Sequence, residues 1–260
     1  MLNIKKLFAS ICIVLVVFIC SGCTDSVLKN SPKNYYGELS HIVSLVKNHF
    51  YYDIESDDII QKNKIFYTKE EFNAAVKVLF FRLDTYSRYC DGSKKSFWSI
   101  FSRVSPKTIY SSSIDGDTLR VKISLFEDGI SSMLQEDTAK YHPKHMIIDL
   151  QNNPGGKIKE AIKMIDLFIS SGKIVTLVKK NHTQTYLATK TSTYQFDSVT
   201  VLVNKNTASS AELVAKALEK YIGATLVGGK TYGKNTIQAL IYLDEAKKEC
   251  LRLTIGKYQL

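Results

Sequence analysis

The chain has 260 residues, of which 45% are hydrophobic and 23% charged, a balance typical of one or two globular domains. Four prolines and thirteen glycines leave no room for a low-complexity linker, and five cysteines exclude a disulfide-dense small scaffold. The net charge of +10 is spread along the chain, and no basic stripe with interleaved aromatic residues is present, so we expect no nucleic-acid partner.

The N-terminus has the pattern of an export signal. Two lysines precede an apolar run over residues 7–20, which is too short for a comfortable membrane span. Small residues then lead to Cys23 in an order that resembles the bacterial lipobox, although Cys20 stands where that motif usually has leucine. We expect a lipoprotein signal peptide over residues 1–22, lipidation of Cys23 and a polar tether over residues 23–35. An ordinary secretory signal and an uncleaved anchor are the alternatives.

This interpretation predicts where the protein resides. A multiply acylated Cys23 would anchor it on the non-cytoplasmic side of a membrane in the bacterial cell envelope. Besides Cys23, cleavage would leave only Cys90 and Cys250. Two such cysteines can pair in an exported protein, but their separation in sequence says nothing of their distance in space. Their pairing, and the oligomeric state, stay open.

Residues 36–110 are expected to form a small, mainly helical region. Apolar residues recur with helical periodicity over residues 36–50. Thr68 and Glu71 have the spacing of a capping box, which predicts a second helix as far as Leu83. Residues 84–89 indicate a turn after that helix.

Residues 111–260 change to an alternation of strands and helices. Strands are predicted at 119–125, 146–148, 174–178, 199–203, 225–227, 237–243 and 250–255, helices at 128–141, 158–168 and 208–221, and a polar hairpin at 180–197. This order predicts an α/β core.

A glycine pair follows the buried strand at residues 146–148. Gly155 and Gly156 can adopt positive φ and can direct backbone N–H groups outward, as an oxyanion site requires. The simpler interpretation is a tight turn between a strand and a helix.

Two further segments carry polar residues at junctions of the predicted elements. Ser209 lies where a strand meets a helix, so the positive helix end would favour its alkoxide, although serine is also a common N-cap. Lys234 is flanked by small residues at the start of a strand. It would act as a base only if desolvated or placed near positive charge, and it is otherwise an ordinary surface lysine.

Together the three segments resemble the C-terminal processing, or tail-specific, serine peptidases. Lys234 lies 25 residues after Ser209, and Gln238 lies four residues further, as in that family. The Asp-Leu-Gln-Asn-Asn-Pro-Gly-Gly stretch at 149–156 and the Leu-Asp-Thr-Tyr-Ser-Arg-Tyr stretch at 83–89 are also similar to family motifs.

The resemblance implies a ClpP/crotonase-like α/β fold and hydrolysis of a polypeptide substrate without metal or cofactor. By the same resemblance Ser209 is the nucleophile, Lys234 its general base and Gln238 the residue that orients the lysine. The N–H of Ser210, with that of Gly155 or Gly156, would form the oxyanion hole.

The chain also departs from the family. Gln151 replaces the usual arginine, and only about 26 residues separate Cys90 from Gly116, where many relatives carry a PDZ domain of about 80–90 residues. Recognition of C-terminal tails is therefore open. The competing functions are a non-catalytic peptide-binding lipoprotein and a crotonase-type enzyme acting on acyl-CoA.

Overall fold

The computed structural model describes residues 35–54, 66–93, 108–189 and 194–260, which belong to one compact unit over residues 34–260. The predicted signal peptide, Cys23 and all of the tether except Tyr35 lie outside the described residues. Within the described ranges, no helix has both the length and the apolar character needed to cross a bilayer.

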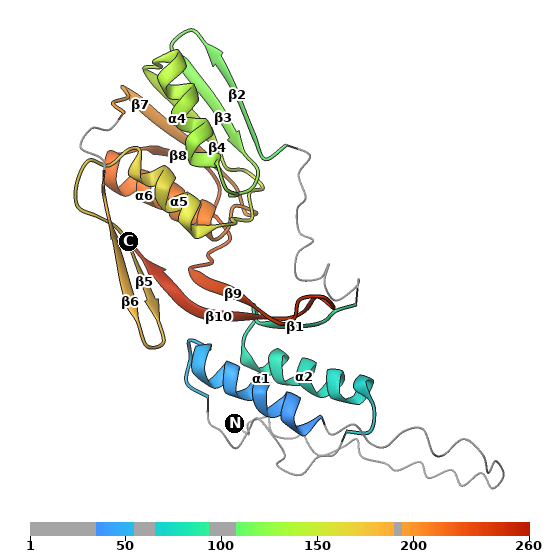
Figure 1. Ribbon diagram of the computed structural model, residues 1–260. Coiled ribbons are helices and arrows are strands. Elements are labelled where there is room, and N and C mark those ends of the chain that lie inside the picture. Colours follow the sequence, from blue (N-terminus) through green and yellow to red (C-terminus); the bar gives the residue numbers. More distant parts are fainter. Residues whose placement is uncertain (1–34, 55–65, 94–107, 190–193) are drawn as a thin grey trace, which may run out of the picture. The chain divides into compact units, whose positions relative to one another are not determined.

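Strands and helices alternate over much of residues 118–228, as the sequence predicts for an α/β core (Figure 1). In chain order they are α1 (Tyr36–His49), α2 (Lys69–Leu83), β1 (Arg88–Asp91), β2 (Tyr110–Asp115), β3 (Thr118–Ile123), α4 (Ile130–Tyr141), β4 (His145–Asp149), α5 (Ile158–Asp166), β5 (Lys173–Lys179), β6 (Thr183–Leu187), β7 (Ser198–Val203), α6 (Ser210–Ile222), β8 (Thr225–Gly228), β9 (Thr236–Asp244) and β10 (Glu249–Gln259).

Helix α2 begins at the predicted capping box. The Thr68 side chain accepts a hydrogen bond from the Glu71 N–H at 3.1 Å, and the Glu71 carboxylate accepts one from the Tyr67 N–H at 2.9 Å. Both bonds satisfy N–H groups at the helix start. The apolar faces of α1 and α2 pack on β1 and β10 in one hydrophobic cluster, whose fully buried members include Val46, Phe72, Val76, Leu251 and Leu253.

Two strands were missed by sequence reasoning. The predicted turn over 84–89 is correct for its first half, where the Asp84 carboxylate accepts the N–H groups of Tyr86 and Ser87. Arg88 and Tyr89, however, already belong to β1, which pairs with the distant β10. Strand β2 was missed because its Ser-Ser-Ser centre is exposed and polar, so it shows no apolar alternation.

One sheet carries the α/β core. Its strand order is β2-β3-β4-β7-β8, and all neighbouring pairs are parallel except β2 with β3. Apolar residues of β3, β4 and β7 form a continuous core with α4, α5 and α6. Because β4 and β7 are parallel neighbours, the loops that follow them leave the same edge of the sheet. Ligand sites in parallel α/β sheets form at this carboxyl edge.

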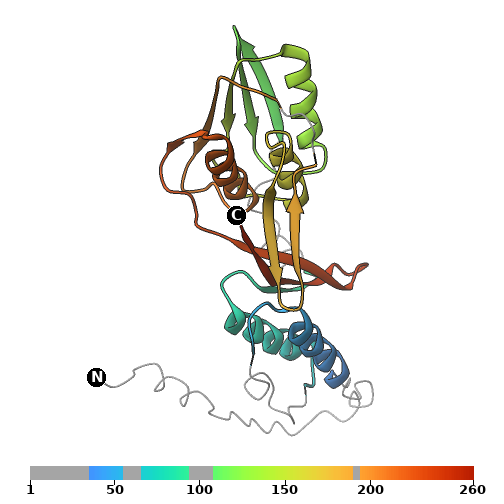
Figure 2. The ribbon, with the colours of Figure 1, turned by 90° about the vertical axis from the view of Figure 1, so that its left-hand side faces the viewer.

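The second sheet is antiparallel. Its order is β1-β10-β5-β6, with β9 also paired to β10. Strand β10 therefore connects the two hydrophobic clusters: Leu251 and Leu253 belong to the cluster around α1 and α2, and Tyr258 belongs to the core cluster. Figure 2 shows the β5–β6 hairpin beside the β9–β10 pair. The predicted polar hairpin is correct in part, because β6 pairs with β5.

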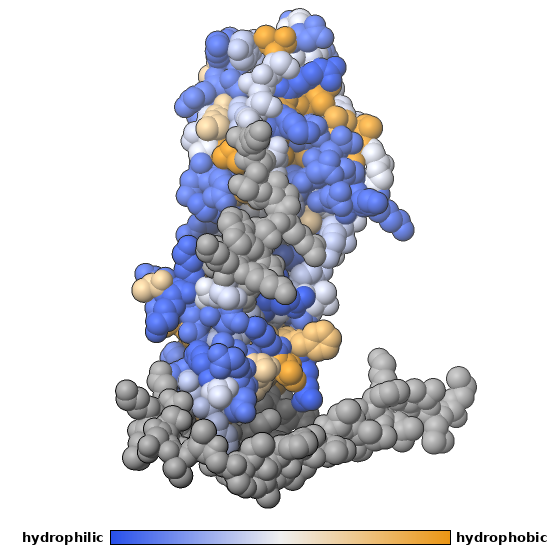
Figure 3. Space-filling model, turned by 90° about the vertical axis from the view of Figure 1, so that its right-hand side faces the viewer, coloured by the Kyte–Doolittle hydropathy of each residue, from blue (hydrophilic) through white to orange (hydrophobic). Residues whose placement is uncertain are grey.

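The face shown in Figure 3 is mostly hydrophilic, with apolar side chains in small separate groups. Scattered apolar groups of this kind are ordinary for a protein surface.

Candidate active site

Ser209 occupies an unusual backbone conformation at the start of α6. Its φ is 56° and its ψ is −119°, in the turn that joins β7 to α6. A positive φ is costly for a residue with a side chain, typically about 1–3 kcal/mol, and such residues gather at functional sites. The half-buried serine also lies at the positive end of a helix. A strained serine between strand and helix is the arrangement that exposes a nucleophile in other hydrolases.

Lys234 lies in the loop between β8 and β9 and is half-buried. Its Nζ is 5.0 Å from the centroid of the Tyr86 ring, so the amine lies over an aromatic face. Tyr86 belongs to the turn between α2 and β1, which therefore reaches the loop that carries the predicted base.

Two side chains each contact both Ser209 and Lys234. Oε2 of Glu212 accepts the Ser209 N–H at 2.9 Å and the Lys234 N–H at 2.8 Å. The Tyr258 hydroxyl, from β10, lies 3.0 Å from the carbonyl oxygen of Lys234 and 3.4 Å from that of Ser209. The loops that carry the predicted nucleophile and base are thus held side by side.

Glu212 connects these loops through both carboxylate oxygens. Besides the two bonds to Oε2, its Oε1 accepts the Thr231 hydroxyl and the Gly233 N–H, each at 2.6 Å. The side chain is fully buried, and four donors satisfy it. Buried charge is tolerated only when it is compensated in this way, so the network fixes the loop after β8 against α6.

The Gly155–Gly156 turn lies directly against the start of α6. Gly155 has a φ of 105°, and a Cβ on it would lie 2.8 Å from the Ser209 Cβ and 3.0 Å from the Ser210 nitrogen. The Ser210 hydroxyl donates to the Gly156 carbonyl at 3.0 Å. The predicted oxyanion residues and the predicted nucleophile therefore lie together.

The structure distinguishes the two glycines. The Gly155 N–H donates to Oδ1 of the buried Asn153 at 2.8 Å, so it is already engaged. The Phe126 N–H donates to the Gly155 carbonyl, and the Phe126 carbonyl accepts the Lys157 N–H. Neither bond uses the Gly156 N–H. Of the two N–H groups left as alternatives by the sequence, that of Gly155 is thus engaged by Asn153.

Gln238 lies on β9, opposite Thr254 of β10. Its amide nitrogen donates to the hydroxyls of Thr236 at 2.9 Å and Thr254 at 3.2 Å. The two threonines hold the amide group, which leaves its oxygen as the acceptor.

Two tyrosines at the site have perturbed acidity. Burial raises the pKa of Tyr258, and the charge of Glu212 raises it further. Burial and a hydrogen bond with Tyr232 raise the pKa of Tyr86, with a smaller contribution from Glu212. Both side chains are therefore neutral donors at physiological pH.

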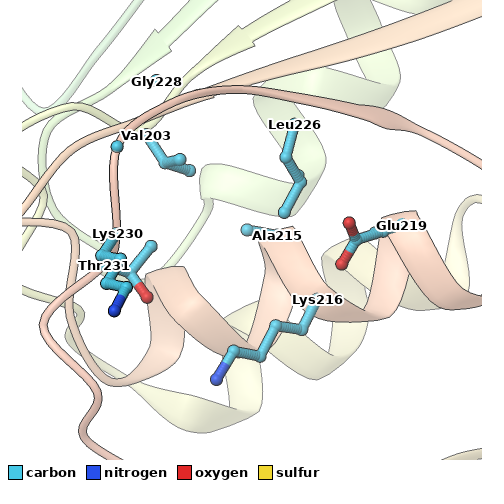
Figure 4. A pocket seen from close by; sticks show the side chains of 9 residues that line it. Val203, Ala215, Lys216, Glu219, Leu226, Gly228, Lys230 and Thr231 are labelled. Atoms are coloured by element: carbon cyan, nitrogen blue, oxygen red, sulfur yellow. The ribbon is translucent and has the colours of Figure 1, made fainter.

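A hollow of about 330 Å³ lies beside this site (Figure 4). Its apolar wall is formed by Val203, Ala215 and Leu226, with Lys216 and Glu219 of α6 at its rim. The hollow meets the Glu212 network at Thr231, but neither Ser209 nor Lys234 lines it. It is thus a neighbour of the site rather than the reaction centre.

No group of three or more His, Cys, Asp or Glu side chains within the described ranges is placed to bind a metal ion.

Sequence reasoning missed several residues that build the site. Glu212 is signalled by its place three residues after Ser209, the spacing of a capping box, but its bonds to the lysine loop have no local signal. Asn153 lies in the predicted 149–156 stretch, but its bond to the Gly155 N–H was not predicted. Tyr86 and Tyr258 reach the site through tertiary structure, and no periodicity or spacing indicates their contacts with it.

Comparisons with known proteins agree with this architecture. The model of peptidase family S41 matches residues 117–260. The carboxy-terminal processing protease CtpA of Bacillus subtilis is 32% identical over 156 residues, which cover 58% of this chain and 33% of that protein. A probable CtpA-like serine protease of Staphylococcus epidermidis is 31% identical over 53% of this chain and 30% of its own length. The matched region thus spans about a third of these curated relatives.

Solved structures show the same fold. A photosystem II D1 C-terminal processing protease has a TM-score of 0.67 at 12% identity, over 85% of this chain and 87% of that chain. A lipoprotein from Streptococcus agalactiae has a TM-score of 0.68 at 18% identity, over 94% and 88%. The fold is the α/β type with a ClpP/crotonase-like core that the sequence resemblance predicted. The chain belongs to peptidase family S41.

Proposed function

We propose that the chain is a serine endopeptidase in which Ser209 attacks the peptide carbonyl and Lys234 is the general base. The proposal depends on a pair of hydrogen bonds: Glu212 Oε2 accepts both the Ser209 N–H and the Lys234 N–H. One buried carboxylate thereby fixes a strained serine and a half-buried lysine, and no purely structural role of an N-cap requires the second bond.

The reaction is acyl transfer through an ester intermediate. The neutral amine of Lys234 takes the Ser209 Oγ proton as Oγ bonds to the carbonyl carbon. The resulting ammonium returns this proton to the leaving amine as the C–N bond breaks. A water molecule, deprotonated by the same lysine, then attacks the acyl-enzyme ester. The lysine returns this proton to Ser209 Oγ as the ester C–O bond breaks, which releases the carboxyl product and regenerates the enzyme.

The N–H groups of Gly156 and Ser210 would stabilise the oxyanion. They belong to two segments joined by the Ser210 hydroxyl bond to the Gly156 carbonyl, and Ser210 is the first residue of α6, where N–H groups lack partners within the helix. Gln238 would orient Lys234 through its amide oxygen, because the amide nitrogen is held by Thr236 and Thr254.

The substrate is an exported protein or peptide, and the enzyme is anchored by lipid on Cys23 at the non-cytoplasmic face of a membrane. The lipobox-like sequence supports this location. Replacement of Cys23 by Ser should release the protein from the membrane fraction, and continued membrane retention would contradict the anchor.

One observation favours a second function. The Lys234 amine lies over the Tyr86 ring, which suits a lysine held as a cation. The alternative is therefore a non-catalytic peptide-binding lipoprotein of the same fold.

The decisive experiment compares residues 24–260 of the wild type with Ser209→Ala and Lys234→Ala. Ser171→Ala and Lys216→Ala are matched controls at exposed positions. Each protein is incubated with loosely structured proteins and with peptides of varied C-termini, and products are identified by mass spectrometry.

Cleavage by the wild type and both controls, but by neither site variant, supports the peptidase. If Ser209→Ala cleaved as well as the wild type, Ser209 would not be the nucleophile. Peptide retention without cleavage, unchanged in both site variants, would favour the binding protein. The cleavage sites also test whether C-terminal tails are recognised.

A further inference from the structure

Cys90 and Cys250 lie directly opposite each other in the second sheet. They are partners in the antiparallel pair of β1 and β10, between the neighbouring pairs Tyr89–Leu251 and Asp91–Glu249. Opposite residues of antiparallel strands have Cβ atoms about 4.5–5.5 Å apart, and a disulfide needs about 3.5–4.5 Å. Only a small approach of the two strands separates this pair from disulfide geometry.

The pair is closed off from solvent. Both thiols are fully buried, and Cys90 also donates to the carbonyl oxygen of Lys248, 3.4 Å away. Burial raises the pKa of the Cys250 thiol to about 12, and the neighbouring Cys90 contributes to this shift. Because both thiols are inaccessible, neither is suited to be a nucleophile toward a substrate.

We propose that Cys90 and Cys250 are a redox-modification site that forms a cross-strand disulfide when the chain meets a disulfide oxidant. In the first step one Cys thiolate attacks the oxidant RS–SR, forms a mixed disulfide and releases RS⁻. In the second, the other thiolate attacks the protein sulfur and releases a second RS⁻. The two protons lost by the cysteines end on two RSH molecules, and the two electrons reduce the oxidant.

The closed sheet dictates when this bond forms. The oxidant cannot reach two fully buried thiols, and at neutral pH a thiol with a pKa of about 12 is almost never a thiolate. Exchange therefore takes place while β1 and β10 are apart, during folding or local opening. Once formed, the bond is shielded from reductants by the same burial.

The bond would fix β1 to β10 next to the candidate site. Tyr86 and Ser87 precede β1 directly, and both already contact β10: the Tyr86 carbonyl accepts from Arg252 at 2.9 Å, and Ser87 Oγ accepts the Thr254 N–H at 3.1 Å. The disulfide closes a long loop, so its main effect is to destabilise the unfolded chain. This inference is independent of the proposed peptidase activity.

The test uses residues 24–260, which contain the whole compact unit and no cysteine other than these two. The denatured chain is refolded in a mixture of reduced and oxidised glutathione, acid-quenched, alkylated under denaturing conditions and digested with trypsin. We expect loss of both free thiols, a mass lower by two hydrogens, and a cross-link between peptides 89–94 and 249–252. The full-length chain, acid-quenched in membranes, should contain the same cross-linked pair.

The oxidised protein should melt about 5 to 15 °C above the same protein refolded with reductant. Cys90→Ala and Cys250→Ala should melt equally in both buffers. Peptide mapping of the wild type needs no variant, so the test stands even if a variant fails to fold. The proposal would be overturned by any of three results. These are two alkylatable thiols after oxidative refolding, stable mixed disulfides with glutathione, and cross-links only between chains.

Discussion

The amine of Lys234 lies over the aromatic face of Tyr86, with Nζ 5.0 Å from the ring centroid. The electron-rich face of an aromatic ring attracts the ammonium form of a lysine more than its neutral form. A general base, however, must be neutral when the serine attacks. The contact with Tyr86 therefore favours the ammonium form, whereas the proposed role of Lys234 needs the neutral amine. Glu212 and Tyr258 also contact this loop, and Tyr232 belongs to it.

Replacement of Tyr86 by Leu should move the acid limb of the pH–rate profile to lower pH. Without the ring the ammonium loses about 0.5–1 kcal/mol of stabilisation, which corresponds to about 0.5 pH unit. Tyr86→Phe keeps the ring and should leave the limb in place. The measurement is kcat/KM between pH 5 and 9 for the three proteins. If the acid limb shifted equally in both variants, or did not shift in Tyr86→Leu, the ring would not control the protonation of Lys234.

Tyr86 also illustrates what local sequence can and cannot predict. The elements of residues 118–259 are predicted well, apart from their ends, because buried strands and amphipathic helices carry strong periodicity. Strand β1 has four residues and is defined by its partner β10, so its own sequence contains little signal. The candidate site could be predicted because the spacing of Ser209, Lys234 and Gln238 resembles that of the family. Their positions at junctions of elements, or on the strand that follows, agree with this prediction.

The supporting contacts behave differently. Tyr258 reaches the site because β10 runs between β5 and β9, and this order of strands is not encoded in any local pattern. The Gly155 N–H is likewise engaged by the side chain of Asn153, a bond that the glycine pair by itself does not predict. Sequence reasoning therefore left the choice between Gly155 and Gly156 open.

Replacement of Glu212 by Gln should reduce activity far more than it changes the fold. The carboxylate accepts four donors, whereas a glutamine amide can accept on its oxygen only and would direct its NH₂ group toward two of them. We expect kcat to fall at least about 100-fold, with a loss of unfolding free energy of about 2–3 kcal/mol.

Glu219→Gln is the matched control, because Glu219 lies on the exposed face of the same helix. Steady-state kinetics and chemical denaturation check both variants. Wild-type kcat in Glu212→Gln would show that the carboxylate does not position Ser209 and Lys234.

Replacement of Gly155 by Ala should displace Ser209. The added Cβ would lie 2.8 Å from the Ser209 Cβ and 2.9 Å from the Ala208 carbonyl oxygen, both shorter than real contacts of a Cβ atom. Gly172→Ala has a similar positive φ of 91° but would meet no atom within 4 Å, so it isolates the backbone strain from the clash.

Both variants should lose about 1 kcal/mol of stability from the left-handed backbone, but only Gly155→Ala should lose activity, by at least about tenfold. Thermal unfolding and kcat/KM are measured for each. Full activity in Gly155→Ala would argue that contact between the glycine turn and Ser209 is unnecessary for turnover.

Asp91 should make stability depend on pH through its contact with α2. Burial alone would raise its pKa, but hydrogen bonds from Lys77 and Ser93 outweigh burial and lower the pKa to about 2, from an ordinary value of 3.8. A carboxylate whose pKa is lower in the folded state contributes its stabilisation above pH 4 and loses it as the pH falls toward 2. Because half of the Lys77 side chain is exposed, solvent screening reduces the contribution to about 1 kcal/mol.

Asp91→Asn should therefore be about 1 kcal/mol less stable than the wild type at pH 7, with the difference shrinking between pH 4 and pH 2. Urea unfolding at a series of pH values provides the comparison, and Asp115→Asn, an exposed carboxylate on β2, is the control. A difference that persists unchanged at pH 2 would assign the loss to packing of the new amide. No difference at pH 7 would mean that the ion pair with Lys77 does not hold α2 to β1.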